Sequence, residues 1–437
     1  MEMDRAVLYA ILARIWEFAA GPVNWLLIAT KFSPTIQGFF YTFGSILALQ
    51  TFAELGIGFV ITQFASHEWA KLRIGENRRI EGDSNALSRL ASLAQIATKW
   101  YSIAAVIVIV GLNIGGYLFF LQSPAQNVSW KFPWIFLCFL TGISFVLIPI
   151  WSLLEGCNQV SNVYSYRFFH GLLNSLVAWT AILLGADLWT VSIVTFAGLI
   201  YAGLFLRRNY WEFFKSLLLI KPEGARLSWL TDILPFQWRI ALSWLSGYFM
   251  FYLFTPVLFH YHGPIIAGQM GMTWSLCGVL TSLGLAWLSP RVPQLGMMVA
   301  QKRYDEMDRL FWKLTFIILG VTISGAMTIW LLIFGLNYYG SSLARRLLPP
   351  LPTALFLVAA IIHTASLPMS SYLRAHKKEP LLFVSVLLGV LIGLSTWLLG
   401  KYYSALGMAV GYLTIYTMVL PITVFVWWHC KKAWHLT

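Results

Sequence analysis

Four residues of the first apolar stretch have the types and spacing of a polar site inside a membrane helix. Arg14, Glu17, Gly21 and Asn24 follow one another at steps of three and four within residues 7–29, so a helix places them on one face. Ionisable side chains inside a membrane-spanning helix are costly, and they normally face the bundle interior or a water-filled cavity. The stripe therefore predicts a wet interior of the kind that transporters have.

Arg14 and Glu17 have two interpretations. Pro22 follows Gly21, so the helix is expected to kink near its middle, and a freed carbonyl can line a cavity there. In this setting the two charges contact a substrate or gate its passage. Alternatively, they form a structural ion pair, and Arg14 extends toward the inner interface.

A second ionisable residue, Glu54, lies within the apolar segment TFAELGIGF. Gly56 and Gly58 beside it allow a neighbouring helix to approach closely. A buried glutamate at this depth is a candidate proton or cation site. The alternative is that Glu54 pairs permanently with Arg14 of the neighbouring helix and only fixes the packing.

Two basic residues of the second half are further candidates. Arg239 opens the seventh apolar stretch, with Ser243, Ser246 and Met250 continuing its face. It is either a counterpart of Arg14 or an ordinary anchor at the inner boundary. His363 lies deeper, and it either binds a ligand or switches protonation, or its ring is satisfied by a backbone carbonyl.

The composition defines the elements that position these residues. Of the 437 residues, 59% are hydrophobic and 11% are charged, and the mean hydropathy is +0.71, which is too apolar for a soluble chain. Stretches long enough to cross about 30 Å of hydrocarbon predict an all-α polytopic membrane protein with about twelve transmembrane helices, near residues 7–29, 39–64, 100–122, 133–154, 168–186, 189–206, 240–259, 265–288, 311–334, 353–373, 381–400 and 405–428.

The basic residues support this topology. With both termini cytoplasmic, 24 of the 30 Lys and Arg residues fall on inner segments and five on outer segments, and Arg14 lies within a span. The positive-inside rule expects this asymmetry. The net charge of +13 is then explained by topology and by anionic membrane lipid, so no nucleic-acid partner is predicted.

Several classes of function and site are disfavoured. The chain has no GxxxxGK[ST] loop for ATP, so a coupling ion such as H⁺ or Na⁺, the membrane potential or the substrate's own gradient would drive transport. Its four cysteines have no paired spacing in outer loops, so no disulfide or metal site is expected. The outer loops are too short for the large catalytic domain that a glycan polymerase or ligase needs. We therefore expect no enzyme and no cofactor.

The chain is expected to divide into an N-terminal six-helix lobe (1–206), a cytoplasmic interfacial linker (207–239) and a C-terminal six-helix lobe (240–437). A faint repeat supports two related halves, because Ser33–Gly38 (SPTIQG) and Gly263–Gly268 (GPIIAG) match at an offset of 230. Each copy would lie in the outer turn between the first two spans of its half, as parallel repeats require. A chance match is the alternative.

The segment from Arg14 to Trp69 resembles the opening of polysaccharide transporters, the Wzx-type lipid-linked oligosaccharide flippases of the multidrug, oligosaccharidyl-lipid and polysaccharide exporter superfamily. An Arg in the first span, the SP-x-x-x-G turn at Ser33, and an acidic residue before LG at Glu54 carry the resemblance. The rest of the chain agrees in span number and loop placement. The acidic residue is Glu here, where Asp is more usual in the family.

The resemblance implies two MATE-like six-helix lobes around a central cavity, in the bacterial cytoplasmic (inner) membrane. It also implies that an undecaprenyl-diphosphate-linked glycan is moved from the inner to the outer leaflet by alternating access, with Arg14 and Arg239 attracting the diphosphate. The alternative function is an ion-coupled multidrug or cation antiporter of the same superfamily, which would need acidic and aromatic cavity residues instead. A scaffold without transport is a third possibility.

Overall fold

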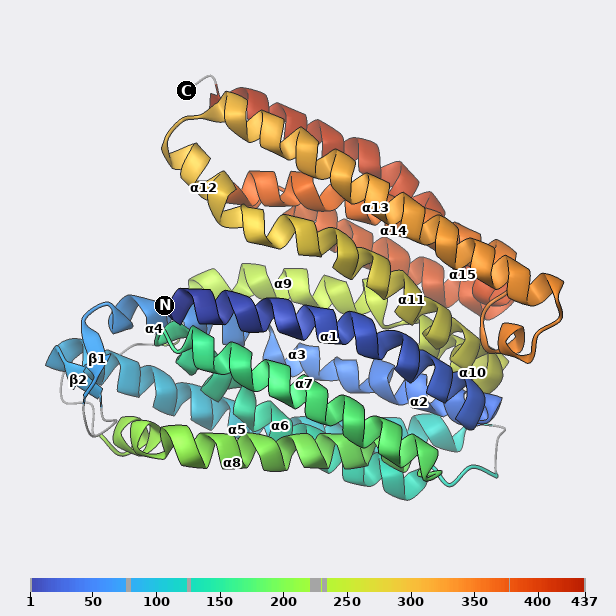
Figure 1. Cartoon of the computed structure of the whole chain (residues 1–437), viewed down its shortest axis with the longest axis horizontal. Helices are drawn as coiled ribbons and strands as arrows, with labels where there is room; N and C mark the ends of the chain where they lie inside the picture. Colours follow the sequence, from blue (N-terminus) through green and yellow to red (C-terminus); the bar gives the residue numbers. More distant parts are fainter. Residues whose placement is uncertain are drawn as a thin grey trace. The chain divides into compact units, whose positions relative to one another are not determined.

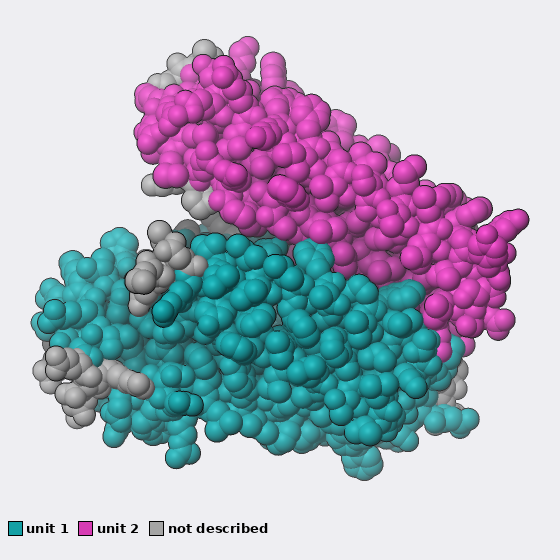
Figure 2. All heavy atoms as spheres, viewed as in Figure 1, with its two compact units in different colours: residues 1–36, 46–122, 126–244 teal, residues 37–45, 123–125, 245–437 magenta. Residues whose placement is uncertain are grey.

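The computed structural model describes residues 2–75, 80–123, 127–220, 229, 234–376 and 378–435. These residues are almost entirely helical and include several helices long and apolar enough to cross a membrane. The prediction of an all-α polytopic membrane protein is therefore confirmed. The chain forms two compact units, coloured separately in Figure 2: unit 1 comprises residues 1–36, 46–122 and 126–244, and unit 2 comprises residues 37–45, 123–125 and 245–437.

Unit 1 is a helical bundle with one small β-hairpin. In chain order its elements are α1 (Glu2–Lys31), the ends of α2 (Pro34–Leu47), η1 (Ala48–Gln50), α3 (Thr51–Glu54), α4 (Ile57–Trp69), β1 (Leu72–Ile74), β2 (Ile80–Gly82), α5 (Ser84–Leu121), α6 (Lys131–Gly156), α7 (Val160–Leu183), α8 (Trp189–Leu219) and the first part of α9 (Leu234–Phe251). Within this unit α1 packs along α7 (Figure 1), and α4 packs along α6.

Unit 2 contains the middle of α2, the rest of α9 and the remaining helices. These are α10 (Phe254–His262), α11 (Pro264–Leu288), η3 (Ser289–Arg291), α12 (Val292–Ala300), α13 (Tyr304–Tyr338), η4 (Ser342–Arg346), α14 (Pro350–Ala375) and α15 (Leu382–His435). Helix α14 packs against α13 and α15.

The predicted spans match this architecture once the helix breaks are taken into account. Eight helices of the described part are long and apolar enough to cross a membrane. Two bent pairs of helices (α2 to α4, and α9 with α10) raise the number to ten if each pair is one span. The other two predicted spans are α7 and the second half of α15, which Ser404 interrupts with a non-helical φ of 56°. The short break predicted at residues 185–187 is present between α7 and α8.

A β-hairpin follows the second span. Strands β1 and β2 pair antiparallel in the register Leu72↔Gly82, Arg73↔Glu81 and Ile74↔Ile80. Asp83 then caps α5, because its Oδ1 accepts the N–H groups of Asn85 and Ala86 at 2.7 and 2.9 Å. These bonds, the Ala86 bond above all, lower the pKa of the Asp83 carboxyl.

The segment predicted as an interfacial linker (207–239) begins within a helix. Helix α8 continues without interruption past Arg207 to Leu219, so the first part of the expected linker is an extension of the preceding helix. The boundary between the two units falls within α9, between Trp244 and Leu245. Residues 221–228 and 230–233 of the expected interfacial segment lie outside the described residues.

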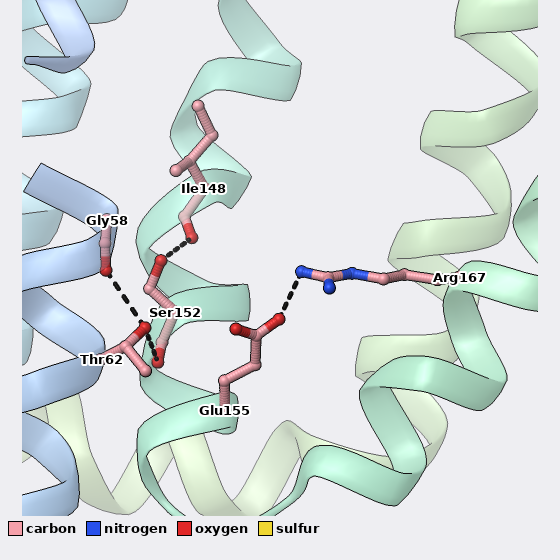
Figure 3. A network of polar contacts seen from close by, with 6 residues as sticks. All are labelled: Gly58, Thr62, Ile148, Ser152, Glu155 and Arg167. Atoms are coloured by element: carbon pink, nitrogen blue, oxygen red, sulfur yellow. Dashed lines mark hydrogen bonds and ion pairs between the residues drawn. The ribbon is translucent and has the colours of Figure 1, made fainter. Parts of the chain in front are cut away.

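Helices α4 and α6 approach each other closely in unit 1. A Cβ on Gly58 would lie 2.9 Å from the Ser152 hydroxyl oxygen, and one on Gly156 would lie 2.5 Å from the Ala65 Cβ. Thr62 Oγ1 lies 3.1 Å from both the Gly58 and the Ser152 carbonyl oxygens (Figure 3). Small residues thus bring the two backbones near enough for a hydroxyl to join them.

Figure 3 also shows an ion pair on the far side of α6. Glu155, near the end of α6, pairs with Arg167 of α7. The Arg167 guanidinium also lies 5.3 Å from the ring centroid of Tyr164. This contact ties α6 to α7 near the turn that joins them.

The two copies of the sequence repeat contact each other in unit 2. A Cβ on Gly38 would lie only 1.9 Å from the Pro264 carbonyl oxygen, and one on Gly268 would lie 2.9 Å from the Gly38 nitrogen. Gln37 Nε2 donates to the carbonyl oxygens of Gly268 and Arg346, both at 2.9 Å. The middle of α2 is therefore held against α11 and η4.

A polar cluster joins the ends of α13, α14 and α15 in unit 2. The Tyr372 hydroxyl donates to Asp308 Oδ1 at 2.7 Å, and Lys431 Nζ lies 2.6 Å from Asp308 Oδ2. His435 stacks on Tyr304 with ring centroids 4.0 Å apart. His376, just after α14, has a buried Nε2 with no hydrogen-bond partner among the described residues.

This cluster predicts acid sensitivity. Burial, helped by the Lys378 charge, lowers the pKa of the His376 imidazole, and the hydrogen bond to the Tyr372 carbonyl opposes that shift only in part. Because the folded-state pKa lies below the ordinary value of about 6.5, the stabilising contribution is complete above that pH and is lost as pH falls through the folded-state pKa. We expect the thermal unfolding midpoint in detergent to decrease as the pH is lowered from about 7.5 to about 5.5. The decrease should be smaller in His376→Gln. An equal fall in both proteins would contradict this assignment.

Candidate functional sites in the two units

Arg14 and Glu17 of α1 are both exposed side chains. Neither makes an ion pair or a hydrogen bond with a residue that the structure describes, so the structural pair between them is not formed. The guanidinium and the carboxylate are thus both available to bind something outside the chain. The interpretation as substrate-contacting charges stays a prediction.

Asn24 has a different position from these two residues. Its Oδ1 accepts a hydrogen bond from Trp179 Nε1 of α7 at 2.6 Å. Nearby, Trp16 Nε1 donates to the Ser175 hydroxyl at 3.2 Å, and the Trp16 and Trp179 rings lie 5.8 Å apart. Asn24 therefore helps to hold α1 against α7, and only part of the predicted stripe is free.

Glu54 lies at a break in the second span. Leu55 and Gly56 both have left-handed backbone conformations, with φ of 50° and 70°, and the helices on either side meet at 46°. The Glu54 side chain is buried at the N-terminal end of α4. Backbone N–H groups at a helix N-terminus are unpaired and positively polarised, so this is a favourable place for a carboxylate.

Both oxygens of the Glu54 carboxylate are bonded at this position. Its Oε2 accepts the Gly56 N–H at 2.8 Å, and its Oε1 accepts the Gly58 N–H at 3.0 Å. The Tyr101 hydroxyl of α5 donates to Oε1 at 3.2 Å. No ion pair with Arg14 is present among the described residues, so the partners of Glu54 are backbone donors and a tyrosine. The sequence interpretation missed Tyr101, although a tyrosine inside an apolar helix is itself a signal for a buried polar partner.

Of the two candidate residues in the second half, the structure describes the side chain of His363 and not that of Arg239. Arg239 belongs to α9, but its side chain lies outside the described residues, so its role stays a prediction. His363 of α14 packs against the rings of Phe251 and Tyr416, with centroids 5.5 and 5.6 Å away. Its ring nitrogens make no hydrogen bond to a described residue.

His363 lines a cavity of about 410 Å³ in unit 2. Three helices besides α14 contribute to the wall: α9, α11 and α15. Aromatic rings and small hydroxyls dominate the lining, among them Phe251, Trp274, Tyr412, Thr281 and Ser282. None of the lining residues in the described part carries a permanent charge. The sequence interpretation missed the hydroxyls, because Thr and Ser in a span are usually satisfied by their own helix.

Unit 1 has a cavity of another kind beside the Glu54 break. It measures about 380 Å³ and lies between the segment from Leu49 to Leu55 and the face of α5 from Trp100 to Leu112. Its lining is almost wholly apolar, with Gln50 as a polar exception. This composition is what hydrocarbon-facing surfaces have.

Solved transporter structures have the same fold. An inward-facing multidrug resistance MATE family transporter of the MOP superfamily matches with a TM-score of 0.67, at 13% identity over 99% of each chain. Lipid II flippase MurJ in an inward closed conformation matches with a TM-score of 0.60, at 13% identity over 96% of this chain and 87% of MurJ. The MATE multidrug transporter DinF-BH matches with a TM-score of 0.60, at 14% identity over 98% of this chain and 95% of DinF-BH.

The helices and these matches together show an all-α polytopic membrane protein with a MATE-like fold. No protein-family model matches the chain, and no curated protein sequence matches it. The identity of the structural matches is low, so they establish the fold and not the substrate. All three are named as transporters or flippases, and none as an enzyme.

Proposed function

We propose that the chain is a flippase that moves a polyprenyl-diphosphate-linked oligosaccharide, such as an O-antigen, capsule or exopolysaccharide unit, from the inner to the outer leaflet. The observation that carries this proposal is that the charged residues of the first two spans differ in whether they have a bonding partner. The Arg14 cation is exposed and unpaired within the described residues, whereas both carboxylate oxygens of the buried Glu54 already accept hydrogen bonds. Because Glu54 is already bonded, Glu17 is the one free carboxylate that could oppose Arg14 in the described part of these two spans, and the free Arg14 cation favours an anionic substrate.

Arg14 suits a diphosphate for chemical reasons. Its guanidinium is always charged and presents paired N–H donors that match phosphate oxygens. The undecaprenyl tail of the substrate remains in the hydrocarbon while the head group enters the protein. The apolar cavity beside the Glu54 break supports such an arrangement in unit 1.

The remaining parts of the proposal concern energy and orientation. A coupling ion, H⁺ or Na⁺, or the substrate gradient would drive the cycle. The chain would lie in the bacterial inner membrane with both termini cytoplasmic, and anionic lipid would contact its basic loops. The lobes 1–206 and 240–437, joined through residues 207–239, would supply the two sides of an alternating-access cycle, with Arg239 as a second phosphate contact.

Substitution of Arg14 tests the proposal. Each charge-assisted hydrogen bond contributes about 1.5–3 kcal/mol, so Arg14→Ala should weaken binding of undecaprenyl diphosphate to the purified chain at least about tenfold. In cells whose surface glycan depends on this chain, display should be lost at equal protein level.

Arg5→Ala is the matched control, because Arg5 is an exposed arginine near the start of the same helix. It should keep both binding and display, and Arg14→Lys should retain part of each. Normal display in an Arg14→Ala strain would contradict the proposed role.

A second candidate function, an ion-coupled cation or drug antiporter, is favoured by Glu17. Its carboxylate is exposed and has no partner among the described residues, so it is free to attract a cation. If the chain is an antiporter, Glu17→Gln should abolish efflux of cationic dyes and Arg14→Ala should leave it intact. If the chain is a flippase, Arg14→Ala should abolish glycan display and Glu17→Gln should leave it intact.

A further inference from the structure

The cavity of unit 2 combines two kinds of surface. One is aromatic: Trp274 and Tyr412 meet edge to face with centroids 5.5 Å apart, and Trp274 also lies near Phe251, at 6.5 Å. The other is polar and uncharged, formed by Thr281, Ser282 and His363. None of the side chains of these three residues makes a hydrogen bond to a described residue. Three hydrogen-bonding groups therefore line one cavity without protein partners in the described part of the chain.

These surfaces exclude two kinds of ligand. A cation would lose its hydration in a cavity whose described lining offers no carboxylate, and ring faces alone compensate only part of that loss. A purely apolar ligand would displace water from Thr281, Ser282 and His363 and leave them without partners, which is unfavourable. The remaining class is neutral, carries several hydroxyls and has an apolar face.

We propose that this cavity binds a neutral sugar ring. The C–H face of a pyranose packs on aromatic rings, while its hydroxyls donate to and accept from side chains such as Thr281, Ser282 and His363. The cavity volume of about 410 Å³ lies in the range of small-molecule sites, about 300–1,000 Å³. The inference rests on the proposed function, because it assigns the glycan part of that substrate to unit 2.

Paired lipid probes test the assignment. The full-length chain, purified in a detergent without a sugar head group, is titrated with undecaprenyl diphosphate carrying glucose, galactose, mannose or N-acetylglucosamine. The same lipid diphosphate without sugar is the reference. We expect at least one sugar to tighten binding about tenfold or more.

Isosteric variants locate the sugar. Thr281→Val with Ser282→Ala removes two hydroxyls at nearly constant volume and should abolish most of the sugar-dependent gain, while binding of the sugar-free lipid is unchanged. The matched control is Thr328→Val with Ser324→Ala, the same exchanges on α13, where both hydroxyls donate to carbonyls of their own helix at 2.9 and 2.8 Å. This control should keep the gain.

The outcomes separate this inference from the proposed function. No gain with any of the four sugars, or a gain that survives the Thr281 and Ser282 exchanges, overturns the sugar site. Tight binding of a cationic dye that these exchanges weaken also overturns it. If Arg14→Ala binds both lipids as the wild type does while the sugar gain is present, the head-group role of Arg14 fails and the sugar site stands.

Discussion

Replacement of Gly38 by alanine is expected to break the contact between α2 and α11 and to lower stability by about 3 kcal/mol or more. The added Cβ would lie 1.9 Å from the Pro264 carbonyl oxygen and 2.5 Å from its carbon. Both are backbone atoms, so no side-chain rotation relieves the overlap, and the two helices must separate. Separation also strains the bonds from Gln37 to the carbonyls of Gly268 and Arg346.

Gly44→Ala is the matched control for this prediction. Gly44 lies on the same helix, and a Cβ there meets nothing within 4 Å, so alanine should be neutral or stabilise the helix by up to about 1 kcal/mol. Thermal unfolding in detergent, followed by fluorescence-detected size exclusion, measures both variants. Equal midpoints for Gly38→Ala and Gly44→Ala would show that the two repeats do not touch at this point.

Removal of the Glu54 carboxylate is expected to be the second large effect. Glu54→Ala leaves the N–H groups of Gly56 and Gly58 and the Tyr101 hydroxyl without their acceptor in the apolar interior of unit 1. Loss of a buried charged acceptor with several donors should cost about 3 kcal/mol. Glu54→Gln should cost somewhat less, because one amide oxygen still accepts while the amide nitrogen opposes one backbone N–H.

A double-mutant cycle identifies the cause of that loss. Tyr101→Phe alone should cost about 1 kcal/mol, and it should cost almost nothing in the Glu54→Ala background, because the acceptor is already absent. Glu17→Ala is the control for removal of a glutamate from an apolar helix, and its effect should stay within about 0.5 kcal/mol. Additive effects of Glu54→Ala and Tyr101→Phe would refute the hydrogen bond between them.

Local pattern predicted the spans well and the polar contacts poorly. The predicted boundary between residues 400 and 405 coincides with the non-helical backbone of Ser404 inside α15. The repeat at an offset of 230 includes Gly38 and Gly268, which lie in contact, but it had suggested two related halves and not this contact. The success with the spans depends on hydropathy, which a short segment carries by itself.

The stripe on α1 shows the limit of this reasoning. Spacing placed Arg14, Glu17 and Asn24 on one face, yet Asn24 bonds to Trp179 while the two charged residues are exposed. Helical period determines which residues share a face. It carries no information about which distant helix covers part of that face.

The sequence by itself determined the membrane class, the span positions and the residues that could do chemistry, because each depends on the hydropathy, charge and period of nearby residues. Only the tertiary structure decided which of these residues are already bonded. Glu54 meets Tyr101, and Asn24 meets Trp179, across distances in the chain that no local pattern encodes. His363 lines a cavity for the same reason, since four separate helices create the space around it.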